Sequence, residues 1–282
     1  MKFLLTFRKI VLMLIFMDFL IPLQGQDEDY PVRSPFETTT LIENQTIINP
    51  YKGSLNFMIY HRFGTVENGI SDLFGIYAPS NISLAVDYGI TDRIMVGFAT
   101  EKDNKMQDIH WKYSVLQQTR SGSMPVSLSY YGNFVIDARE DQYFYPEENY
   151  RFMHRFSYFT QLILARKFSD AFSFQVAPSF IYFNAVEPGI GNMHAGIHLG
   201  GRAKFTPAMS ALVVYDQLLT NVEAYDVKPN LGIGIEIGTA THSFQVFAAS
   251  YRELVAQKNY VYNTNDFFDG QVMLGFNITA RL

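Results

Sequence analysis

Residues 81–100 constrain the fold more strongly than any other stretch of the chain. Bulky apolar residues occupy every second position over 82–90, and small or polar residues, including Asp87, occupy the positions between them. After Thr91-Asp92-Arg93 the same alternation resumes over 94–98. A period of two on both sides of a short polar turn predicts a β-hairpin. One apolar face and one polar face are typical of strands that separate lipid from a wet lumen.

The N-terminus has the organisation of an export signal. Lys2, Arg8 and Lys9 accompany an apolar run from Ile10 to Leu23, and one acid and one proline interrupt this run. Such a run is too short and too broken for a membrane-spanning helix, which needs about 20 consecutive apolar residues. We therefore expect residues 1–25 to be a cleaved signal peptide.

Composition excludes several classes of function. The chain has no cysteine, which excludes disulfides, thiolate metal sites and thiol catalysis. Without residues 1–25 it carries 19 basic and 26 acidic residues, a net charge of −7, and no basic cluster for nucleic acid. Aromatic residues make up 16% and charged residues only 17%, whereas soluble domains carry about a quarter charged residues. With no later run suited to a transmembrane helix, this composition favours a membrane β-barrel.

Twelve segments have the length and alternation of membrane strands. They are expected at 54–63, 81–90, 94–100, 108–117, 126–136, 156–168, 172–183, 195–205, 209–218, 231–237, 244–251 and 271–282. An even number of strands is typical of single-chain bacterial barrels. The predicted fold is therefore all-β, an antiparallel up-and-down transmembrane barrel of about twelve strands over residues 53–282. A secreted soluble β-sandwich is the alternative fold.

The lengths of the connections predict how the barrel is oriented. Short turns are expected at 91–93, 169–171, 206–208 and 240–241, and long loops at 64–80, 137–150, 184–193, 220–229 and 252–269. Bacterial barrels have short periplasmic turns and long external loops, which places both termini in the periplasm. Residues 26–52 contain three prolines and an acidic start, and we expect an extended segment that is either periplasmic or lumenal.

Energetics decides which face of each strand meets lipid. An Arg or Lys side chain at the bilayer midplane costs about 2–4 kcal/mol, so the polar face must point inward. The residues predicted to line the lumen are Arg62, Asp87, Lys112, His198, Arg202, Lys204, Asp216, Glu236 and Arg281. Two interpretations remain open: a pore lining that selects solutes by charge, or a network of ion pairs that closes the barrel. Arg62 is the first expected partner of Asp87.

No catalytic, metal or cofactor site is predicted. His194 and His198 are four residues apart, but glycines interrupt any helix there and no third ligand is in sight. His61 and His242 share the lipid-facing parity, which raises lipid hydrolysis as an alternative, although neither lies in a serine-containing motif of that kind.

Part of the chain resembles an uncharacterised family of bacterial membrane-bound β-barrel domains. The matching residues lie over 33–118 and are Arg33, Pro35-Phe36-Glu37, Leu41-Ile42, Gln45-Thr46, His61-Arg62-Phe63-Gly64, Asp72-Leu73-Phe74-Gly75, Tyr88-Gly89-Ile90-Thr91-Asp92-Arg93, Lys112-Tyr113, Leu116 and Gln118. The resemblance implies an outer-membrane barrel. It supplies no reaction, substrate or catalytic residue.

The sequence therefore predicts an outer-membrane protein that acts as a narrow channel or in uptake of small solutes. The alternatives are a structural or partner-binding barrel, with recognition loops at 137–150 and 252–269, and a lipid-modifying enzyme. The expected partners are outer-membrane lipid, a small solute and the barrel-insertion machinery. That machinery would read the final strand, which ends at Leu282.

Overall fold

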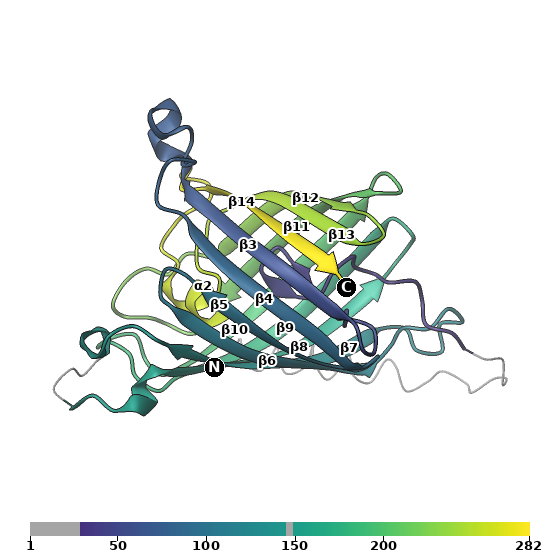
Figure 1. Ribbon diagram of the computed structural model, residues 1–282, viewed down its shortest axis with the longest axis horizontal. Helices are drawn as coiled ribbons and strands as arrows, with labels where there is room; N and C mark the ends of the chain where they lie inside the picture. Colours follow the sequence, from purple (N-terminus) through teal and green to yellow (C-terminus); the bar gives the residue numbers. More distant parts are fainter. Residues whose placement is uncertain (1–28, 145–148) are drawn as a thin grey trace, which may run out of the picture.

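The chain folds into one closed barrel of twelve antiparallel strands (Figure 1). The computed structural model describes residues 29–144 and 149–282, so the predicted signal peptide lies outside the described residues. Each barrel strand pairs with the next one along the chain, and the last pairs with the first, β14 with β3. The barrel strands are β3 (Leu55–Thr65), β4 (Asn81–Thr91), β5 (Ile94–Glu101), β6 (Met106–Leu116), β7 (Ser127–Asp137), β8 (Phe156–Lys167), β9 (Phe172–Phe183), β10 (Met193–Lys204), β11 (Met209–Leu218), β12 (Asn230–Gly238), β13 (His242–Ala249) and β14 (Met273–Arg281).

The predicted fold class and strand count are confirmed, and the soluble β-sandwich is wrong because the sheet closes on itself. The predicted strand ends lie within two residues of the observed ones. No helix among the described residues is long and apolar enough to cross a membrane.

Alternation along the strands places apolar side chains outside and polar side chains inside. On β4, Leu84 and Val86 are 42% and 38% exposed, whereas Ser83 and Asp87 are buried. Closure also pairs the backbone of every barrel strand on both sides, as hydrocarbon requires because it offers no hydrogen-bond partner.

Two segments outside the barrel wall fill its interior (Figure 1). The hairpin insert, residues 36–48, contains the short strands β1 (Thr40–Leu41) and β2 (Asn44–Gln45). The helical insert, residues 250–263, lies between β13 and β14 and contains α2 (Ala256–Tyr262). Side chains alone fill a barrel of about eight strands, while 16–18 strands leave an aqueous channel. Twelve strands leave intermediate space, and here both inserts occupy it.

The two inserts enter from opposite ends of the barrel. The chain before the hairpin insert lies at the short-turn end, where Pro31 bridges to Thr119 and the Val32 amide donates to the Gln118 carbonyl at 2.9 Å. The helical insert descends from the long-loop end. Among the described residues, that end also carries the short 3-10 helices η1 (Val66–Asp72), η2 (Asp141–Tyr143) and η4 (Phe152–Arg155).

Candidate functional site

The tip of the hairpin insert is held by side-chain amides of the barrel wall. Ile42 lies at the tight turn between β1 and β2 with φ = 57°, a left-handed conformation that disfavours β-branched residues. Its amide donates to Gln245 Oε1 at 3.1 Å, and its carbonyl accepts from Asn277 Nδ2 at 2.6 Å. Strained backbone persists only where its surroundings fix it, and here two wall residues do so.

A buried ion pair joins the same turn to β3. Glu43 Oε2 lies 2.6 Å from Arg62 Nη2, and the Arg62 side chain is fully buried. The Arg62 guanidinium also donates to Asn277 at 2.9 Å and lies 4.4 Å from the centre of the Phe247 ring. Burial raises the pKa of the Glu43 carboxyl to about 7, with Arg62 opposing the shift. Breaking this pair would leave an uncompensated charge inside the barrel.

A second charge cluster holds the start of the hairpin insert near the short-turn end. The Glu37 carboxylate lies 2.9 Å from Arg281 and 3.5 Å from Arg202. Arg202 also pairs with Glu236 at 2.7 Å, and Glu236 accepts from Gln245 at 3.0 Å. One continuous network therefore links the insert to strands β10, β12, β13 and β14.

The opposite edge of the hairpin insert contacts β6, β9 and β11. Asn44 donates to Asp216 at 3.2 Å, and Asp216 Oδ1 accepts from His198 Nδ1 at 2.7 Å. The Gln45 side chain accepts from Lys112 at 3.0 Å, while the Gln45 carbonyl accepts from Gln175 at 2.9 Å. The wall thus binds both edges of the insert through polar groups.

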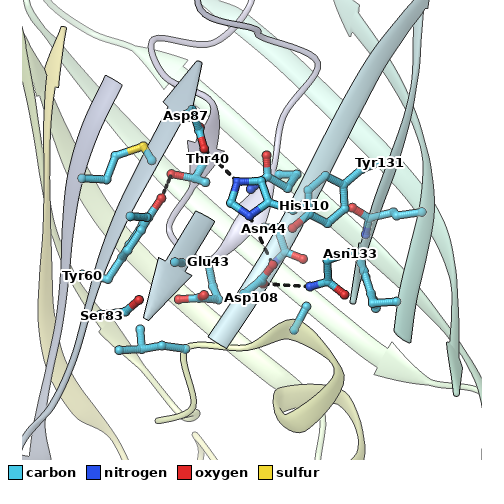
Figure 2. Close-up of a pocket in the computed structure, with 18 residues that line it drawn as sticks. Thr40, Glu43, Asn44, Tyr60, Ser83, Asp87, Asp108, His110, Tyr131 and Asn133 are labelled. Carbon is cyan, nitrogen blue, oxygen red and sulfur yellow. Dashed lines mark hydrogen bonds and ion pairs between the residues drawn. The ribbon is translucent and has the colours of Figure 1, made fainter. Parts of the chain in front are cut away.

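A small cavity of about 40 Å³ separates the two inserts, and Figure 2 shows the polar residues around it. His110 lies between two carboxylates, 2.8 Å from Asp87 and 3.2 Å from Asp108. Asn133 donates to the second oxygen of Asp108 at 2.9 Å. The cavity has room for a few water molecules.

Apolar packing holds the helical insert in the other half of the lumen. Tyr260 and Val261 of α2 pack into a buried cluster with Phe159 and Ile181 of the wall. Gly196 of β10 makes room for this contact, since a Cβ there would lie 2.5 Å from the Tyr260 ring. Polar contacts hold it as well: Gln257 donates to Asn133 and to Ser157, each at 3.2 Å, and the Leu254 amide donates to Glu101 at 3.2 Å.

The structure buries most of the predicted lumen residues and brings some of them together. Arg62, Asp87, Lys112, His198, Arg202, Asp216 and Glu236 are buried, and Lys204 and Arg281 are half-buried near the short-turn end. His198 meets Asp216, Arg202 meets Glu236, and Glu37 joins Arg202 to Arg281. Lys204 joins none of these clusters.

The predicted pairing of Asp87 with Arg62 is wrong. The register of β3 and β4 places Asp87 opposite Asn56, and it places Arg62 opposite Asn81. The two charges are therefore six positions apart along the sheet, about 20 Å at the rise of a β-strand. Asp87 pairs instead with His110, and Arg62 pairs with Glu43.

The sequence leaves residues 26–52, which include Glu37 and Glu43, as either periplasmic or lumenal, and it predicts 252–269 only as a loop. It does not predict the contacts of Glu37 and Glu43, nor the burial of the helical insert. In the structure 250–263 is mostly buried, and the exposed part of the loop is its tip, where Phe268 is 87% exposed. A signal was present in the inward-facing glycines, because Gly196 and Gly200 leave space that Tyr260 and Leu41 occupy.

The histidines considered for metal or hydrolytic chemistry are separately engaged. His194 bonds Thr220 at 2.9 Å, and His198 bonds Asp216, so the two do not form a ligand pair. The part of the chain that the structure describes holds no cluster of three metal-ligating side chains. His61 stacks on Phe276 with ring centres 4.9 Å apart, and His242 bonds Thr241. The register places these two lipid-facing histidines at different heights, so they share no site.

Several solved outer-membrane barrels have a similar arrangement of strands at low sequence identity. An outer membrane channel from Pseudomonas putida F1 is 12% identical, with 83% of this chain and 96% of that chain covered and a TM-score of 0.48. For the NanC porin the identity is 8%, the coverage 80% and 97%, and the TM-score 0.49. The KdgM porin is 7% identical, with coverage of 81% and 97% and a TM-score of 0.46. These likenesses do not bear on what passes through this chain.

No curated protein sequence matches the chain. A family model described as a membrane-bound β-barrel domain matches residues 36–282, which include both inserts and most of the segment whose residues resemble that family. The chain therefore belongs to this uncharacterised family of membrane-bound β-barrel domains.

Proposed function

We propose that this protein is a gated channel for small polar solutes in the outer membrane, and that the hairpin insert is its gate. The observation that carries the proposal is the chemistry of the contact between this insert and the wall. The wall binds the insert through guanidinium, amide and ammonium groups, and water can replace each of these contacts.

Displacement of the insert would expose a polar passage. The wall residues that it covers include Arg62, Lys112 and Asp216, which are charged groups suited to contact with hydrated solutes. An intramolecular hydrogen bond contributes only about 0.5–1.5 kcal/mol net, because water replaces it on release. The same residues that close the lumen would therefore line it when it is open.

The direct test is to compare the full chain with a variant that lacks residues 36–48. Both proteins are refolded, checked for heat-modifiable migration, and reconstituted in planar bilayers. The full chain should show rare openings, and the deletion should show steady conductance. A folded deletion variant that conducts no ions and passes no solutes in liposome swelling would contradict the proposal.

A partner-binding barrel without transport is the second candidate. The observation that favours it is the loop around η1, where Ile70 and Tyr77 are 79% and 78% exposed and the chain extends away from the barrel (Figure 1). A silent deletion variant would favour this second candidate, since a scaffold needs no passage.

A further inference from the structure

A second, larger cavity lies beside the helical insert at the long-loop end. Its volume is about 380 Å³, within the range of about 300–1,000 Å³ that is usual for small-molecule sites. The wall of this cavity, here called the outer pocket, comes from η2, η4, α2 and the ends of β7 and β9. It is separate from the small cavity between the inserts and shares no lining residue with it.

Lys258 of α2 supplies a positive charge to the outer pocket. Its ammonium lies 4.3 Å from the centre of the Tyr262 ring and 5.5 Å from that of Phe183. Among the described residues no carboxylate forms an ion pair with it. Burial lowers the pKa of Lys258, while the carboxylates of Asp137, Glu253 and Glu101 oppose this shift.

The acidic groups of the outer pocket are engaged elsewhere or lie at its edge. Asp137 is held by the Arg139 guanidinium with a shortest contact of 2.6 Å. Glu253 accepts from Asn104 at 2.7 Å, and burial raises its pKa, which favours its neutral form. Glu187 is exposed to solvent. Two guanidiniums also line the pocket, and each has an ion-pair partner: Arg139 pairs with Asp137 and Arg155 with Asp141, both at 2.6 Å. Among the described cations of the pocket, the Lys258 ammonium is therefore the one without a carboxylate at ion-pair distance.

We propose that the outer pocket binds a small organic carboxylate with a flat apolar group. The carboxylate would pair with Lys258, and the apolar group would lie against the rings of Tyr262 and Phe183. An incoming anion relieves the cost of burying an unpaired cation, and the aromatic rings exclude water from the ion pair. That the outer pocket is the entry site of a channel rests on the proposed function. Binding to the pocket does not, because it is measured without transport.

The test is calorimetric titration of the detergent-solubilised full chain with benzoate as the probe. Benzamide, which has the same shape without the charge, is titrated in parallel, and empty micelles provide the blank. Benzoate should bind saturably at one site per chain. Benzamide should bind at least about tenfold more weakly, the factor that corresponds to about 1.4 kcal/mol.

Substitutions then assign the contact to Lys258. Lys258→Met should weaken benzoate binding about tenfold or more, and Lys258→Arg should retain most of it because the charge remains. Lys102→Met is the matched control, since the Lys102 side chain is 57% exposed and outside the pocket. Equal binding of benzoate and benzamide, or unchanged benzoate binding in folded Lys258→Met, would overturn the assignment. If the full chain binds benzoate but the variant without residues 36–48 conducts nothing, the binding site stands and only the proposed channel is refuted.

Discussion

The two inserts fill one lumen but differ in the groups that meet the wall at the centre of each insert. At its tip the hairpin insert meets the wall through an ion pair and through wall side chains that bond its backbone, as at Ile42 and Glu43. The helical insert places Tyr260 and Val261 in an apolar cluster with the wall. The chain also continues into a barrel strand on both sides of the helical insert, whereas the hairpin insert joins a barrel strand only at its C-terminal side.

This difference indicates which insert can move. Polar contacts exchange with water at little net cost, while apolar contacts lose their full burial when they separate. The hairpin insert also buries Phe36, Leu41 and Ile42, so it needs a trigger and does not drift out freely. We therefore propose that the hairpin insert is the gate and that the helical insert supports the barrel.

The largest expected effect comes from breaking the buried ion pair of the hairpin insert. Arg62→Met leaves Glu43 without its partner, at a cost of about 3–5 kcal/mol for the seated insert. We expect frequent channel openings and faster proteolysis within residues 36–48. Arg93→Met, at an exposed turn position, is the control. Openings as rare as those of the unmodified chain would show that the ion pair between Arg62 and Glu43 does not hold the hairpin insert in place.

The double variant Arg62→Met/Glu43→Gln sharpens the same comparison. Removing both charges leaves no unpaired ion, so the double variant should open less often than Arg62→Met alone. A strictly additive effect of the two substitutions on opening frequency would show that the two residues do not act as a pair.

The helical insert should respond to substitution in stability and not in gating. Val261→Ala removes buried apolar volume and should cost about 1–3 kcal/mol. The expected readout is a lower temperature of heat-modifiable unfolding, with the frequency of openings unchanged. If Val261→Ala opens the channel as strongly as Arg62→Met does, the division of roles is wrong.

A smaller effect is expected from pH. Glu43 lies on the hairpin insert, outside the membrane-spanning strands, and burial raises its pKa from 4.5 to about 7. The seated insert therefore binds more protons than the released one, and this stabilisation is complete below about pH 4.5 and is lost as the pH rises through about 7. Openings should be more frequent at about pH 8 than at about pH 5. Glu43→Gln should remove this pH dependence, and an opposite trend in the unmodified chain would refute it.

The smallest effect is expected at the short-turn end of the barrel, where the chain before the hairpin insert contacts the wall. Hydrogen bonds from Ser121 and Ser123 lower the pKa of the exposed Asp29 carboxyl to about 2. Asp29→Ala removes these bonds and should slightly increase proteolysis near residue 30 without changing conductance. A large rise in conductance would show that the contact of Asp29 with Ser121 and Ser123, and not the interior network, holds the hairpin insert in place.

The barrel could be predicted from sequence because its signal is local and repeated. Period two over residues 82–90 depends only on neighbouring positions, and a one-residue slip would turn every side chain to the wrong face. Strand ends and lipid-facing parity followed from the same pattern. The family resemblance, confirmed over 36–282, depended on local motifs in the same way.

The interior could not be predicted because its contacts join distant parts of the chain. Glu43 contacts Arg62 of β3, the strand that follows the hairpin insert along the chain. Asn44, in contrast, contacts Asp216, which is 172 residues away. The partner of Asp87 depends on the register between strands, and that register is not visible in the alternation of either strand alone. Segment 36–48 carries no long periodic pattern, so its place is set by the wall that surrounds it.

The central claim is that movement of the hairpin insert opens the passage, and a reversible cross-link tests it most directly. The short side chains of Asn44 and Asp216 touch at 3.2 Å, and the chain has no native cysteine to interfere. Single-channel recording of Asn44→Cys/Asp216→Cys, with each single variant as control, compares the oxidised and reduced states of one protein. The account predicts no openings after oxidation and their return after reduction. Equal opening frequencies in the two states, with the disulfide verified, would contradict it.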